Sequence, residues 1–129
     1  MGLLLTIHGE IRWLVALVAL IAIIKFAHGW LTRAEYKGID RGLMAAFSGL
    51  LDLNLLLGLV LLISLGTGVT ARIEHAVTMV IALVIAHSSS LWRRSNNPTT
   101  LFRNNLLAVI VALVVVFIGV VRLRGGWTF

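Results

Sequence analysis

The chain has 129 residues, of which 60% are hydrophobic and only 12% are charged. A soluble domain carries about 25% charged residues, so this composition places the chain among membrane proteins. Cysteine is absent, which excludes disulfides, thiolate metal sites and cysteine nucleophiles. The net charge of +6 does not indicate nucleic-acid binding, because the basic residues lie at the ends of apolar segments, where Lys and Arg set membrane topology.

Four apolar segments predict four transmembrane helices, over residues 11–30, 43–65, 73–92 and 106–123. Each segment is long enough to cross a hydrocarbon core of about 30 Å. The connections are short, so we expect neighbouring helices to be antiparallel and residues 1–129 to form one all-α, four-helix domain. Residues 1–11 lack the features of a cleaved signal peptide, so the first segment is expected to be retained.

The first segment carries a stripe of small and polar residues that begins at His8. At about 100° per residue, the other members of the stripe lie within about 40° of His8; they are Arg12, Val15, Ala19, Ala22 and Phe26. Small residues let helices approach closely in membranes, so this face is predicted to be the bundle interior. His28 falls about 160° from His8, and we expect it to extend to the headgroups.

The second segment holds an acid, Asp52, near mid-membrane, where a charge costs several kcal/mol unless it is paired or protonated. Asp52 continues a stripe of small residues, Gly42, Ala45 and Gly49, and is therefore expected to face inward. It could serve as a proton relay or contact a quinone head, or it could form an interhelical hydrogen bond as a neutral acid. Asn54 lies about 200° round the helix from Asp52 and is expected to meet a partner subunit or another helix.

The third segment opens with Glu74 and His75, and an ionisable residue at this depth is by default a functional-site hypothesis. His75 shares a stripe of mainly small residues with Met79, Ala82, Ala86 and Ser89, and is expected to face inward. His87 lies about 120° round from His75 and is predicted to be interfacial or to face a neighbouring helix.

The fourth segment has no ionisable residue before Arg122 and is predicted to be a packing helix. Residues 95–100 are expected to form a loop in which Pro98 stops any helix that tries to continue. Asn104 and Asn105 offer a cap for the fourth helix.

His8 and His75 are predicted to meet, because segments one and three run in the same direction and both residues begin their segments. One interpretation is a pair of neutral imidazoles that bind a metal, with haem iron the best candidate. Arg12 could then pair with a haem propionate, and Glu74 could reach His8 or Arg12. The other interpretation is an ion pair between Glu74 and Arg12, with the histidines hydrogen-bonded nearby. The residues alone leave both open.

The distribution of basic residues predicts the orientation. The end that holds the first and third loops carries Lys25, Arg33, Lys37, Arg41, Arg93, Arg94 and Arg103. The opposite end carries Arg12, Arg72, Arg122 and Arg124. This excess places the first and third loops inside and both termini outside.

Three short motifs resemble those of small bacterial four-helix membrane proteins that are labelled cytochrome-b-like. They are His8–Val15, Leu51–Gly58 and Glu74–Met79, and the similarity covers most of the chain. The resemblance implies that His8 and His75 are haem ligands, that Arg12 and Glu74 lie near them, and that the protein resides in the bacterial inner membrane. The chain departs from the family pattern at Asp52 and His87.

These observations predict a small b-type cytochrome-like protein that carries one haem and passes electrons to or from a quinone or partner complex. The alternative is a non-catalytic accessory subunit of a larger respiratory or photosynthetic complex, with or without a chlorophyll-type pigment on one histidine. A small transporter ranks lowest, since no segment is broken at mid-membrane. Soluble-enzyme motifs are missing, so no independent catalytic activity is expected.

Overall fold

The computed structural model describes residues 2–65 and 70–124, which are almost entirely helical. The elements are α1 (Gly2–Thr32), α2 (Gly38–Leu65), α3 (Thr70–His87), the short 3₁₀ helix η1 (Ser88–Leu91) and α4 (Pro98–Arg124). Within the described ranges, the four α-helices are all long and apolar enough to cross a membrane. The prediction of an all-α chain with four such helices is confirmed.

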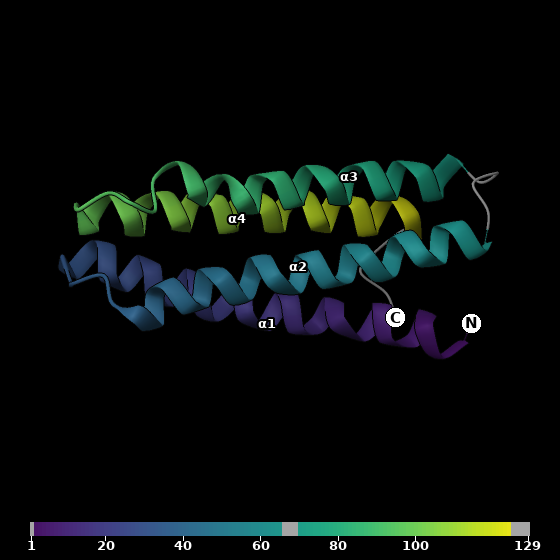
Figure 1. Cartoon of the computed structure of the whole chain (residues 1–129), viewed down its shortest axis with the longest axis horizontal. Coiled ribbons are helices and arrows are strands. Elements are labelled where there is room, and N and C mark those ends of the chain that lie inside the picture. Colours follow the sequence, from purple (N-terminus) through teal and green to yellow (C-terminus); the bar gives the residue numbers. More distant parts are fainter. Residues whose placement is uncertain (1, 66–69, 125–129) are drawn as a thin grey trace.

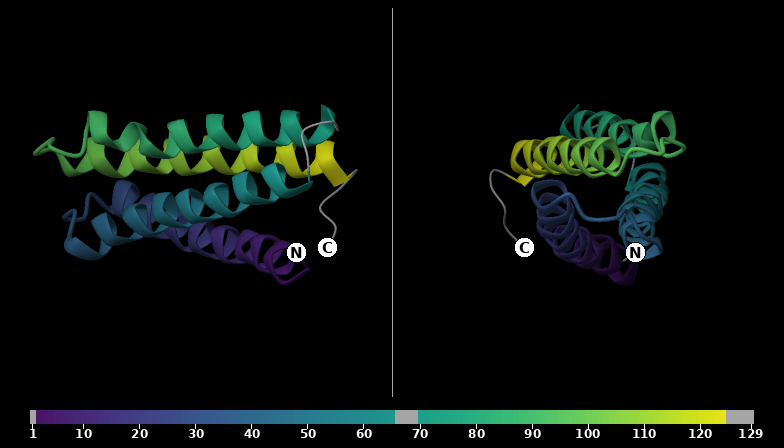
Figure 2. Two further views of the ribbon diagram at one scale, coloured as in Figure 1. Left: turned by 45° about the vertical axis from the view of Figure 1, so that its right-hand side comes forward. Right: turned by 90° about the vertical axis from the view of Figure 1, so that its left-hand side faces the viewer.

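The four helices lie side by side along one long axis (Figure 1). The helix α1 packs against α2 and α4, and α3 packs against the same two neighbours. Seen end on, α1 and α3 occupy opposite corners of the bundle (Figure 2). Side chains on the inner faces of α1 and α3 therefore meet across the bundle axis.

The predicted inner stripes of α1 and α3 do form the core. Ala19, Ala22 and Phe26 of α1 are fully buried, as are Ala82 and Ala86 of α3. His28 is exposed, as its place off the stripe predicted. Larger side chains on α2 and α4 fill the space that these alanines leave; among them are Phe47, Phe102 and Val109.

Four predicted helix ends are wrong by five residues or more. The helix α2 begins at Gly38 instead of residue 43, and α3 ends at His87 instead of residue 92, where the 3₁₀ helix η1 takes over. The helix α4 begins at Pro98, not at residue 106, because proline fits the first turn of a helix, where its missing N–H is not needed. Asn97 caps this turn by accepting a hydrogen bond from the Thr99 backbone N–H at 3.1 Å, so the cap is not at Asn104 or Asn105. The helix α1 begins nine residues earlier than predicted, at Gly2.

The predicted inner face of α2 is also wrong. The stripe that was expected to face inward is exposed; it consists of Gly42, Ala45, Gly49 and Asp52. Its large neighbours Met44, Phe47 and Leu51 are buried instead. The physical reason is volume, because the narrow alanine faces of α1 and α3 need bulky partners to fill the core. Small residues indicate close approach only where another helix covers them, and within this chain no built Cβ at Gly42 or Gly49 meets an atom within 4 Å.

A hydrogen-bonded network closes the end of the bundle that holds the α1–α2 and α3–α4 connections. Lys25 Nζ donates to Asp40 Oδ1 at 2.6 Å, and the Lys37 backbone N–H donates to Asp40 Oδ2 at 2.9 Å. Beside them, Trp92 Nε1 donates to Asn105 Oδ1, and Asn105 Nδ2 donates to the Tyr36 hydroxyl, both at 2.7 Å. We call these six residues the loop-end network.

Candidate functional site

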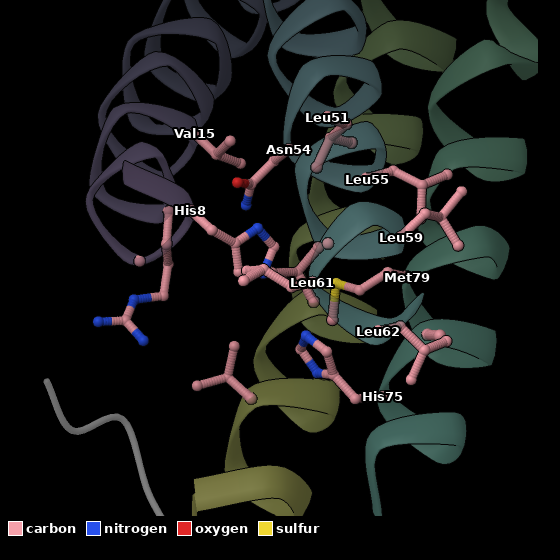
Figure 3. A pocket seen from close by; sticks show the side chains of 16 residues that line it. His8, Val15, Leu51, Asn54, Leu55, Leu59, Leu61, Leu62, His75 and Met79 are labelled. Carbon is pink, nitrogen blue, oxygen red and sulfur yellow. The ribbon is translucent and has the colours of Figure 1, made fainter. Parts of the chain in front are cut away.

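A cavity of about 200 Å³ lies at the other end of the bundle, between the start of α1 and the end of α2. All four helices contribute to its wall, and the lining is mostly aliphatic. The polar side chains in the wall are those of His8, Arg12, Asn54 and His75. Figure 3 shows His8 and His75 extending into this pocket from α1 and α3, with their rings toward one another.

The two imidazoles lie close together across the bundle axis. Their ring centroids are 6.5 Å apart, and the ring planes are nearly perpendicular, at 88°. The predicted meeting of His8 and His75 is therefore present in the structure. It arises because each histidine begins the inner stripe of its own helix, and the two helices stand at opposite corners of the bundle.

A backbone carbonyl orients the His75 ring. His75 Nδ1 lies 3.2 Å from the carbonyl oxygen of Gly119 in α4. A carbonyl can only accept, so this contact requires the proton on Nδ1 and leaves the lone pair on Nε2. That tautomer is the one in which Nε2 serves as a metal ligand while the other ring nitrogen is held by the protein.

Glycine makes room for the His8 ring. A Cβ built on Gly58 of α2 would lie 3.0 Å from His8 Cε1, closer than such contacts usually are. Gly58 stands on the same face of α2 as Leu51, Asn54 and Leu61, which also line the pocket. The spacing of three, four and three residues between these positions is that of one helix face. It could have predicted the inner face of α2 correctly, unlike the stripe of small residues.

The donor set fits a cofactor that needs two protein ligands. Each imidazole could supply one nitrogen to a cofactor held between the two rings, whose centroids are 6.5 Å apart. Among the described residues, no group of three or more His, Cys, Asp or Glu side chains could hold a metal ion. Zinc sites need three or four protein ligands, whereas the porphyrin of a haem leaves only the two axial positions to the protein.

The enclosed space is smaller than the 300–1,000 Å³ that is typical of small-molecule sites. The pocket can therefore enclose only part of a porphyrin, and the remainder would extend through its partly open side. Arg12 is only 8% exposed and lines the same pocket, one turn from His8. A nearly buried guanidinium in apolar surroundings favours an anion beside it, and carboxylates are its usual partners.

Asn54 lies in the pocket wall, whereas its position opposite Asp52 predicted a contact with a partner subunit or another helix. Its side chain lines the cavity, and its Oδ1 is buried with no hydrogen-bond donor in the described part of the chain. An unsatisfied buried acceptor costs about 1–3 kcal/mol, so a donor from a ligand or a water molecule would be favoured there.

The other predicted site residues lie outside the pocket. The Glu74 side chain is exposed and is not part of the cavity wall, so its contact with His8 or Arg12 stays a prediction. Asp52 faces away from the cavity and lies 2.8 Å from His87 Nε2, which is the neighbouring-helix contact expected of His87 as one of two alternatives. A contact between Asp52 and a ligand in the pocket finds no support in this arrangement.

Comparisons with protein-family models, with curated proteins and with solved structures found no match to this chain.

Proposed function

We propose that the protein is a membrane-embedded b-type cytochrome that holds one haem between His8 and His75. The observation that carries the proposal is the separation of the two ring centroids, 6.5 Å, in a pocket that offers two imidazoles and no third ligand of the His, Cys, Asp or Glu type among the described residues. A chlorophyll-type pigment needs only one axial histidine, so the facing pair favours haem over that alternative.

Each group of pocket residues would have a different role in binding the haem. His8 and His75 would hold the haem through imidazole nitrogens, and the Gly119 carbonyl would fix the orientation of the His75 ring. Arg12 would pair with a propionate, and the aliphatic wall would exclude water. The haem would supply one-electron redox chemistry, and the chain's part would be ligation, burial and electrostatic tuning.

We further propose that the four helices insert into a bacterial inner membrane as an antiparallel bundle with both termini outside. The loops around residues 33–37 and 92–97 lie at the end of the bundle away from the pocket, and the larger share of basic residues gathers there. If that end is cytoplasmic, the pocket lies toward the outer surface, where a quinone or a partner complex would exchange electrons with it. Reporter fusions to either terminus test this orientation.

The optical spectrum of the purified protein tests the haem assignment. We expect a reduced-minus-oxidised difference spectrum of a six-coordinate b-type haem, which His75→Ala and His8→Ala each abolish. The matched control is His28→Ala, because His28 is an exposed histidine on α1 outside the pocket. A wild-type protein without any haem signal, or a signal that survives both pocket substitutions, would overturn the proposal.

A non-catalytic accessory role in a larger complex is the second candidate. Its support is the extent of apolar surface left open on α3 and η1, where Val77, Val84 and Leu91 are more than half exposed. Lipid alone could cover this surface, so the experiment is co-purification. Larger subunits that remain bound to a His8→Ala protein without haem would favour the accessory role.

A further inference from the structure

A polar pair faces outward from the middle of the bundle. Asp52 lies near the centre of α2, and its Oδ1 is 2.8 Å from Nε2 of His87 at the end of α3. The two side chains are 48% and 51% exposed, with Asp52 the less exposed of the two. Both residues belong to helices that are apolar enough to span a membrane.

Such a pair is costly against lipid. A charged side chain near the bilayer centre costs about 2.5–3.5 kcal/mol on insertion scales, and polar groups at this depth usually face protein or a water-filled cavity. The haem pocket cannot cover this pair, because Asp52 and the pocket residue Asn54 point to opposite sides of α2. We therefore expect another membrane component to cover Asp52 and His87.

The pair is complementary to itself. Asp52 and His87 lie side by side on two adjacent helices, one an acceptor and the other a base. A rotation of 180° about an axis along the bundle puts Asp52 of one copy opposite His87 of the other, and the reverse contact forms at the same time. This reciprocity is the property of an isologous two-fold interface.

The backbone beside the pair can be approached closely. Gly42, Ala45 and Gly49 lead along the exposed face of α2 to Asp52, and Ala46 beside them is exposed as well. Ala45 and Gly49 have the four-residue spacing of helix pairs that pack tightly in membranes. No contact within the described part of the chain requires glycine at positions 42 and 49, since a Cβ on either residue would meet open space.

We propose that the α2–α3 face around Asp52 and His87 binds a second copy of this chain in a two-fold dimer. Each Asp52 then meets His87 of the second copy as well as its own, and the small residues of each α2 lie against α3 of the second copy. The four polar groups cover one another from lipid, and the pockets remain on the far sides of the two α2 helices. The dimer does not depend on the haem assignment.

Cysteine cross-linking tests the dimer directly, because the chain contains no cysteine of its own. In native membranes, a bifunctional maleimide long enough to reach across the two-fold axis is expected to shift the Gly49→Cys protein from the monomer mass to twice that mass. The control is Val114→Cys, which places a thiol on the exposed face of α4, where Val114 is 51% exposed.

Three results would overturn the proposal. They are a Gly49→Cys protein that stays monomeric, one that cross-links no more than Val114→Cys, and one that cross-links mainly to a protein of different mass. The last would assign the face to another membrane protein. Because the readout is mass, it is independent of the haem spectrum.

Charge substitutions test the role of the polar pair. Asp52→Leu leaves an apolar side chain in an exposed position, so the monomer is expected to fold, and Gly49→Cys cross-linking is expected to fall in that background. The double exchange Asp52→His with His87→Asp restores both reciprocal contacts and is expected to restore cross-linking. Undiminished cross-linking in the Asp52→Leu background, or no recovery in the exchanged protein, would contradict the reciprocal arrangement.

Discussion

The two ends of the bundle differ in the surroundings of their buried polar groups. At the loop end, Asp40 is fully buried and both of its carboxylate oxygens accept hydrogen bonds. At the pocket end, two imidazoles and a nearly buried guanidinium surround a cavity of about 200 Å³. The loop end is filled and internally satisfied, whereas the pocket end keeps space among groups that could bind a ligand. The loop end therefore contributes to stability, and the pocket end is where we propose that a ligand binds.

Among the substitutions that test the difference between the two ends, a change of Asp40 is expected to have the largest effect on stability. We expect Asp40→Ala to lower the free energy of unfolding by about 2–3 kcal/mol, because it removes the partner of Lys25 and the bond to the Lys37 N–H. The loss stays below that of a fully buried pair, since the Lys25 side chain is 35% exposed. Thermal and denaturant unfolding in detergent measure it.

The matched control for Asp40→Ala is Glu35→Ala, which removes an exposed carboxylate from the same connection. Its effect should stay within about 0.5 kcal/mol. Equal effects of the two substitutions would mean that the loop-end network does not hold the bundle together.

A glycine to alanine change at the filled end is the next largest expected effect. A Cβ on Gly29 would lie 2.5 Å from ring atoms of Phe102, which is fully buried. Phe102 is also held by the Tyr36 ring, at a centroid distance of 5.2 Å, and by Phe26. We expect Gly29→Ala to destabilise the protein by about 1–2 kcal/mol, because overpacking outweighs the better helix propensity of alanine.

A glycine to alanine change at the pocket end should affect the free energy of unfolding less and the bound ligand more. A Cβ on Gly58 would meet His8 Cε1 at 3.0 Å, and the ring can move by a few tenths of an ångström into the cavity. We expect Gly58→Ala to change unfolding by less than about 1 kcal/mol, but to alter the haem spectrum or redox potential. A destabilisation as large as that of Gly29→Ala would show that the pocket end is packed as tightly as the loop end.

The smallest expected effect is a dependence on alkaline pH. Burial raises the pKa of Tyr36 above its usual value near 10, and the Asp40 carboxylate adds to the increase, although the hydrogen bond from Asn105 opposes it. A raised folded-state pKa contributes stability that is fully present below the unfolded pKa and is lost as the pH rises through the folded pKa. Unfolding measured across this range should therefore show a small loss above pH 10.

Tyr36 is the only tyrosine of the chain, so the ultraviolet absorbance of tyrosinate reports its titration alone. The control is Tyr36→Phe, which should remove this part of the pH dependence. A tyrosinate midpoint below 10 would contradict the burial of Tyr36 in the loop-end network.

The sequence predicted α1 and α3 well and α2 poorly, and the reason is physical. On α1 and α3, His8, His75, Arg12 and the core alanines mark one face, and that face points into the bundle. On α2, two different faces carry polar residues, and both lipid and core are apolar, so hydrophobicity cannot decide between them. The choice depended on the volume needed opposite the alanines, which only the assembled bundle reveals.

The loop-end network and the oriented His75 were also beyond the reach of the sequence. Tyr36 and Asn105 are 69 residues apart along the chain. His75 is oriented by the Gly119 carbonyl, and every residue carries such a group, so no pattern marks it. By contrast, the start of α4 was available from the sequence, because Asn97 followed by Pro98 is a standard beginning for a helix.

The unequal lengths of α1 and α3 have a consequence for the surrounding bilayer. With 31 residues, α1 is about 46 Å long, whereas the 18 residues of α3 extend about 27 Å. Figure 2 shows α1 inclined to α3 and α4, which shortens its projection on their common direction. If the bundle spans a membrane as proposed, a helix so much longer than the hydrocarbon layer accommodates the mismatch by tilting, and its packing against α2 and α4 sets the angle. Because His8 is carried on the early turns of α1, this inclination fixes the separation of the two imidazoles.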